Sequence, residues 1–147
     1  MPVTAPEIAR RTFLAALGVP LFADTRQQVF DLFTTMASAL SEGNGLAFLD
    51  HVDHAMADYG KLEKCILALT AQNEVMSSID LLKDEGDDHA QTAELDWFLQ
   101  IRSREQSGPL ERRRQIVRCR LERPKKKWKV TAIEPVDFFA PPALTSR

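Results

Sequence analysis

Two stretches of alternating apolar and polar residues constrain this chain more than any other feature. They span residues 92–103 and 110–120 and are joined by a short polar segment. In the first stretch every second residue is apolar: Ala93, Leu95, Trp97, Leu99 and Ile101. A period of two is typical of a β-strand that buries one face. The two stretches therefore predict a long antiparallel hairpin whose apolar face covers a core.

The two strands of this hairpin become complementary when the turn is placed near Ser107. Opposite charges, or apolar side chains, then face each other across the strands, which stabilises an antiparallel pair. The predicted pairs are Asp96 with Arg118, Glu94 with Arg120, Phe98 with Ile116 and Trp97 with Val117.

The first half of the chain shows helical periodicity instead. Apolar residues recur there at the spacing of one helix face: Val29, Leu32, Phe33, Met36, Ala37 and Leu40. We predict a helix from Asp24 to Gly43, with Thr25 and Gln28 as a capping box and Gly43 as the stop. Shorter helices are predicted over residues 45–52 and 61–72.

Further strands are predicted before and after the hairpin. One covers residues 74–84, and the last covers residues 127–134 and is stopped by Pro135. Phe138 and Phe139 are expected to cap one end of the sheet. Helices followed by four consecutive antiparallel strands predict an α+β fold, with helices laid across one face of a curved sheet.

Length and composition fit one globular domain and exclude several classes of protein. The 147 residues divide into an N-terminal segment (1–23), a folded domain (24–140) and a tail (141–147). The net charge of −2 gives no overall field for nucleic acid, although residues 112–129 are rich in Lys and Arg. Strand alternation sends those charges to both faces, so we predict no nucleic-acid partner. No run of about 20 apolar residues exists, so no membrane-spanning helix is predicted.

Two cysteines are too few for a disulfide framework or a thiolate metal site. Cys65 lies on the apolar face of a predicted helix and Cys119 on the apolar face of the hairpin. Both are predicted to be core residues. A disulfide between them stays open, because sequence does not show whether their Cα atoms approach closely enough.

The N-terminal 23 residues resemble a twin-arginine export signal. Arg10 and Arg11 are followed by Phe13 and Leu14, within an apolar stretch of about the length of a signal core. Such a signal would direct the folded protein to the periplasm or the cell exterior. Leu21 stands where cleavage favours a small residue, so the alternative is a retained segment on a cytoplasmic protein.

The element order and three segments together resemble the nuclear transport factor 2-like (NTF2-like) superfamily and its SnoaL-like group. The segments are ELDWFLQI, RRRQIVRCRLER and WKVTAIEPVDFF, within residues 24–140. The resemblance implies a cone-shaped roll, also called cystatin-like, with an apolar pocket at its wide end. We expect that pocket to be lined by Phe33, Met36, Phe48, Leu95, Trp97, Leu99 and Val117. Members include isomerases, dehydratases, hydrolases and non-catalytic binding domains, so the fold selects no chemistry.

The catalytic residues of these enzymes do not carry over. Ketosteroid isomerase, a worked example of tuned carboxyl groups, places its tyrosine on the first helix. The only tyrosine here is Tyr59, after the second predicted helix. Dehydratase members use histidines on the sheet, whereas His51 and His54 precede it. The Asp-Arg-Asp relay of the epoxide hydrolases would need Asp96, which lies on the face turned away from the pocket.

Four residues are candidates for proton transfer: Asp80, Asp58, His54 and Tyr59. Three lie near the expected pocket rim, where burial raises the pKa of a carboxyl group. Asp80 interrupts an apolar strand, so inward it would be a buried base and outward a surface acid. We favour the outward orientation, because burial of an unpaired charge is costly. No metal or other cofactor is predicted, since the two histidines have no third ligand fixed by the sequence.

The sequence favours a non-enzymatic domain that binds a small apolar or amphipathic ligand or serves as an interaction module. The alternative is a cofactor-independent isomerase, dehydratase or hydrolase. Phe98 and Ile116 lie among charges on the outer sheet face and predict a homodimer contact there. Arg113 shares the apolar phase near the turn. We expect it at a solvated end of the strand, with anion recognition at the pocket mouth as the alternative.

Overall fold

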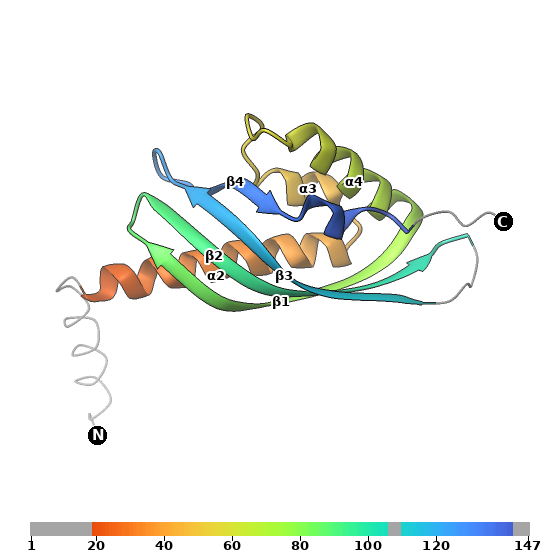
Figure 1. Cartoon of the computed structure of the whole chain (residues 1–147), viewed down its shortest axis with the longest axis horizontal. Helices are drawn as coiled ribbons and strands as arrows, with labels where there is room; N and C mark the ends of the chain where they lie inside the picture. Colours follow the sequence, from red (N-terminus) through yellow and green to blue (C-terminus); the bar gives the residue numbers. More distant parts are fainter. Residues whose placement is uncertain (1–18, 106–109, 143–147) are drawn as a thin grey trace, which may run out of the picture.

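A computed structural model of the protein describes residues 19–105 and 110–142, with side chains from Asp24 onward. Figure 1 shows α2, α3 and α4 on the concave side of a bent sheet. The four strands pair antiparallel in the order β1-β2-β3-β4. The elements are α2 (Val19–Ser41), α3 (Gly45–Leu49), α4 (Tyr59–Gln72), β1 (Asn73–Gly86), β2 (Ala90–Ser103), β3 (Glu111–Glu122), β4 (Lys129–Glu134) and a 3₁₀ helix, η1 (Val136–Phe139). The predicted α+β roll is confirmed.

The register of the β2–β3 hairpin differs from the prediction by two residues. Glu94 lies opposite Arg118, and Asp96 lies opposite Ile116. Because the shift is even, every side chain keeps its predicted face. In this register Asp96 takes a forked, two-bond contact from Arg114, with Nη2 2.7 Å from Oδ2, in place of the predicted partner Arg118.

The predicted start of the first helix was wrong, whereas its end is confirmed. The described part of α2 begins at Val19, so Thr25 lies within the helix and is buried rather than capping it. Gln28 is also inside α2, where its amide Nε2 donates to Asp24 Oδ2 one turn earlier. Gly43 adopts a φ of +74° just beyond the helix, the left-handed geometry of a helix stop.

A bulge in β1 changes which side chains face the helices. Before the bulge Val75 and Leu81 are buried, while Asp80 is exposed on the outer face, which confirms the favoured orientation. The register shifts between Leu81 and Lys83. An extra residue reverses the alternation, and Asp84 is consequently half-buried, with Oδ1 lacking a hydrogen-bond partner among the described residues.

The interior of the roll is filled by aromatic rings. Trp97 packs edge-on against Phe33 at 6.3 Å and against Phe139 at 5.1 Å between ring centroids. Phe48 lies 5.6 Å from Phe139. The predicted cap over the sheet end is therefore an insertion: η1 turns Phe139 into the core, where it is fully buried.

Arg113 holds this insertion in place. Its Nη1 donates to the backbone oxygens of Phe138 at 2.7 Å and Ala140 at 2.6 Å, while its Nε pairs with Glu111. The side chain is only 17% exposed. The expectation of a solvated arginine was wrong, because the C-terminal segment folds back over β3 and supplies carbonyl acceptors.

Both cysteines are free thiols: Cys119 is buried and Cys65 is partly buried. Burial raises the pKa of both thiols, far more for Cys119. Within the described segments, no helix combines the length and apolar character needed to cross a membrane.

Candidate functional site

The seven residues predicted to line a cone pocket are packed in the core. Each has no solvent exposure: Phe33, Met36, Phe48, Leu95, Trp97, Leu99 and Val117. The one polar atom among their rings, Trp97 Nε1, donates to Ser77 Oγ at 2.9 Å. The surface pockets described below are lined by other residues. Ligand binding by this set stays a prediction.

The four proton-transfer candidates do not converge. Asp80 lies on the outer face opposite Asp96, and Asp58 is exposed at the start of α4, where its side chain caps no backbone group. The structure brings together only His54 and Tyr59, whose ring centroids are 4.5 Å apart. His54 lines a shallow pocket of about 400 Å³ that includes none of the other three. Burial, then the charges of acidic neighbours, raise the pKa of Tyr59.

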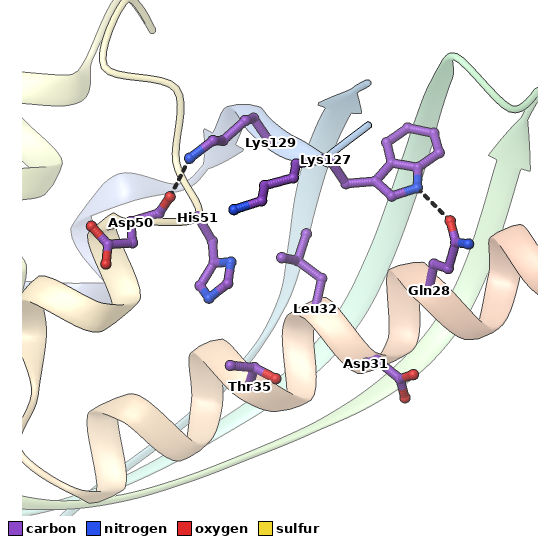
Figure 2. Close-up of a pocket in the computed structure, with 9 residues that line it drawn as sticks. Gln28, Asp31, Leu32, Thr35, Asp50, His51, Lys127 and Lys129 are labelled. Carbon is purple, nitrogen blue, oxygen red and sulfur yellow. Dashed lines mark hydrogen bonds between the residues drawn. The ribbon is translucent and has the colours of Figure 1, made fainter. Parts of the chain in front are cut away.

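A groove on the helix side of the fold brings together side chains from α2, from the segment after α3 and from the segment that enters β4 (Figure 2). Its volume is about 520 Å³, within the range of small-molecule sites. One wall is a face of α2 that carries Gln28, Asp31, Leu32 and Thr35. Spacings of three and four residues place these side chains on the same side of a helix. The remaining lining is Asp50 and His51, which follow α3, Lys127 and Trp128, which precede β4, and Lys129, the first residue of β4.

Backbone hydrogen bonds fix the second wall of the groove. Val130 N donates to His51 O, and Asp53 N donates to Val130 O, each at 2.8 Å. This exchange makes a parallel bridge between Val52 and Val130. Lys129 Nζ also donates to the backbone oxygen of Asp50. The backbone of the segment after α3 is therefore held against β4.

Gln28 fixes the opposite end of the groove. Its Oε1 accepts from Trp128 Nε1 at 2.9 Å and from Arg123 Nη1 at 2.8 Å. The Arg123 guanidinium also lies 4.8 Å from the centre of the Trp128 ring and donates to Asp88 O. One amide oxygen thus ties α2 to the β3–β4 turn.

The electrostatics of the groove centre on His51. Burial lowers the pKa of its imidazole, and the Lys129 and Lys127 charges lower it further against a smaller opposing effect of Asp50. The ring is therefore neutral at neutral pH and offers one donor and one acceptor nitrogen. Figure 2 shows the Lys127 ammonium directed toward this ring and the Asp50 carboxylate directed away from it.

The sequence reasoning missed this groove. The signal was present as a mainly polar i, i+3, i+4, i+7 face on α2 and as the run KKKWK, but the two are about 100 residues apart. Only the fold brings them together. Among the described residues, no group of three or more His, Cys, Asp or Glu side chains is arranged to hold a metal ion.

The outer face of the sheet segregates charge by strand. β3 presents exposed arginines at 112, 114, 118 and 120, while Asp80 on β1 and Glu94 and Asp96 on β2 form a mainly acidic side that also carries Lys83 and Arg102. Glu94 and Asp96 already form ion pairs with Arg118 and Arg114 of the same chain. Exposed apolar side chains accompany them: Met76 at 58%, Leu82 at 49% and Ile116 at 43%. Phe98 is half-buried in the middle strand, opposite Arg114.

Solved structures share this architecture at low sequence identity. A conserved protein from Planctomyces limnophilus matches with a TM-score of 0.69 and 6% identity, over 76% of this chain and 94% of that one. An NTF2-like superfamily protein from Salmonella enterica serovar Typhimurium matches at 0.63 and 8%, over 76% and 89%. The chain has the NTF2-like fold. A candidate dehydratase of the NTF2-like family from Streptomyces avermitilis matches at 0.59 and 12%, over 76% and 94%.

These similarities concern the fold and not an activity. No protein-family profile matches the sequence, and neither does any curated protein. Since one fold of this kind carries many functions, the function has to be argued from the surfaces of this chain.

Proposed function

We propose that the protein is a non-catalytic NTF2-like interaction module of the SnoaL-like kind that works as a homodimer through the outer face of its sheet. One observation carries the proposal: the side of the sheet where an enzyme of this fold would hold its substrate is filled. Trp97, Phe33, Phe48 and Phe139 occupy that space with no exposure. The opposite face keeps large apolar side chains in solvent.

The charge distribution of the outer face fits a second copy of the same chain. A two-fold axis parallel to the strands and lying over β2 would set β3 of one copy over β1 of its partner. The arginines of β3 would then approach Asp80, and Phe98 would approach its own symmetry mate. Such an interface is self-complementary, as a two-fold contact requires.

Mutation of the apolar centre tests this arrangement. Phe98→Asp should convert a dimer to monomers in sedimentation velocity, because two carboxylates would meet at the symmetry axis. Leu46→Asp is the matched control, since Leu46 is 67% exposed on α3, away from the sheet. That variant should keep the dimer mass.

A second variant provides an independent test in case Phe98→Asp fails to fold. Asp80→Arg changes an exposed side chain, so the fold should persist, while the acidic side gains a charge that repels β3 of the partner. We expect weaker association with an unchanged circular dichroism spectrum. Dimer mass retained in both Phe98→Asp and Asp80→Arg, or a monomeric parent protein, would overturn the proposal.

The enzymatic alternative has less support from the geometry. Proton-transfer catalysis needs titratable groups within hydrogen-bond reach of one reacting atom. Asp80 and Asp58 lie on separate surfaces, and only His54 and Tyr59 are in contact. A cofactor-independent isomerase, dehydratase or hydrolase would show turnover that His54→Ala abolishes, and this outcome would replace the present proposal.

Export is a separate part of the proposal. Arg10, Arg11, Phe13 and Leu14 lie outside the described residues, so support comes from the sequence alone. N-terminal sequencing of protein recovered from outside the cytoplasm tests it. A chain found in the cytoplasmic fraction with Met1 intact would count against export.

A further inference from the structure

The geometry points to a second role for this module: the groove between α2 and the start of β4 binds a small organic carboxylate with an apolar or aromatic body. The groove lies on the helix side of the fold, whereas the proposed dimer face lies on the outer side of the sheet. Neither inference depends on the other.

Two lysines, Lys127 and Lys129, line the groove, and neither forms an ion pair with a carboxylate of the described residues. Lys129 is held by the backbone oxygen of Asp50, a neutral acceptor. None of the residues that the structure describes forms an ion pair with Lys127, whose ammonium is aimed at the His51 ring. An anion bound between Lys127 and His51 would receive a charge-assisted hydrogen bond from the lysine and a second bond from the imidazole N–H.

The acidic residues of the lining leave this position open. Asp31 accepts from Gln27 Nε2 at 2.8 Å, and Figure 2 shows its carboxylate on the α2 side, turned away from the lysines. The Asp50 carboxylate also points away from the ring. The groove therefore has a cationic wall, made by Lys127 before β4 and Lys129 at its first position, and an acid on the helix wall. This combination favours a ligand with one negative charge.

Apolar surface next to the lysines indicates that the uncharged part of the ligand is apolar or aromatic. Leu32 points into the groove (Figure 2). The lining also includes Trp128, whose Nε1 donates to Gln28 Oε1. A carboxylate ligand with a ring would place that ring against these two side chains. Inorganic phosphate is a poorer match, because it has no apolar part to contact Leu32 and Trp128 in the lining.

Binding of benzoate to the full-length protein, followed by two-dimensional NMR, tests the assignment. Benzoate should shift the resonances of groove residues in a saturable manner, and benzamide, which has the same shape without the charge, should bind at least about 10-fold more weakly. The bound anion should also raise the pKa of His51, since a nearby negative charge favours imidazolium.

Two lysine variants separate groove binding from general attraction. Lys127→Met should weaken benzoate binding by about 10-fold. Lys126→Met, an exposed neighbour outside the lining, should leave it unchanged. The assignment is overturned if benzamide matches benzoate, if Lys127→Met binds normally, or if inorganic phosphate shifts the same resonances more strongly than benzoate.

Discussion

At the scale of single residues, the half-buried carboxyl of Asp84 makes the stability of the fold depend on pH. Burial raises the pKa of its carboxyl, against a smaller opposing effect of Arg26. Protonation of Asp84 therefore stabilises the folded state. That contribution is complete below the ordinary Asp pKa of about 3.9 and is lost as pH rises through the folded pKa. At neutral pH the fold carries a half-buried carboxylate, one oxygen of which has no hydrogen-bond partner in the described part of the chain.

Asp84→Asn should consequently stabilise the protein at pH 7. The expected gain is under about 1 kcal/mol, because solvent reaches the group and reduces the penalty. Thermal melts at pH 7, 5 and 4 should show the gain shrinking as the pH falls. Glu74→Gln, at an exposed position of the same strand, should change little at any pH. A gain that is independent of pH would show that the charge of Asp84 is not its origin.

Substitution by alanine is expected to have opposite effects on stability at two glycines. Gly86 ends β1 with a φ of +141°, and an added Cβ would clash with the backbone oxygen of Ala90, so Gly86→Ala should cost about 2 kcal/mol or more. Gly60 lies in the first turn of α4 with open space around it, so Gly60→Ala should stabilise by about 0.5–1 kcal/mol. Urea unfolding measures both values. Equal effects would contradict the geometry of the β1–β2 turn.

At the scale of elements, the Arg113 contact decides whether η1 stays inserted. Arg113→Met keeps the length of the side chain but removes the donors to Phe138 O and Ala140 O. We expect a loss of about 1.5–3 kcal/mol and faster amide exchange within η1. Arg112→Met, on the outer face of the same strand, should leave η1 exchange unchanged. Unaltered exchange in the Arg113 variant would mean that ring packing alone holds the insertion.

The β2–β3 hairpin and its contact with η1 show which features could be predicted from the sequence and which could not. Alternation gave the strands and faces of β2 and β3 correctly, because it depends only on the chemistry of successive residues. The environment of Arg113 was predicted wrongly because its acceptors are main-chain oxygens about 25 residues away. Every residue has such an oxygen, so the sequence does not indicate which ones Arg113 will contact. The hairpin register was missed by two residues, since pairs two residues apart offer similar charge complementarity.

The candidate groove was harder to predict for a related reason. Each of its walls reads as an ordinary surface segment: a polar helix face, a histidine after a short helix, and a lysine-rich turn. Their meeting depends on the parallel bridge between Val52 and Val130. No local sequence pattern predicts such a bridge. The individual walls can therefore be predicted from their own segments, but the groove that they form appears only in the folded structure.

At the scale of the whole molecule, the segregation of charge across the sheet predicts how the proposed dimer responds to salt. The chain is nearly neutral at −2, so general repulsion between copies is small. Attraction between β3 and the acidic side of the partner's sheet is screened as the Debye length falls from about 10 Å at 0.1 M salt toward about 3 Å at 1 M.

Sedimentation equilibrium at 50, 150 and 500 mM NaCl should therefore show the dimer dissociation constant rising by several-fold to about 10-fold, equivalent to about 1 kcal/mol. Contacts around Phe98 alone would give a different result, because burial of apolar surface is insensitive to salt in this range. Asp80→Arg should flatten the salt response as well as weaken association, since screening then relieves a repulsion in the same interface. A parent dimer whose affinity does not change with salt would mean that attraction between the β3 arginines and the acidic side of the partner's sheet does not stabilise the interface.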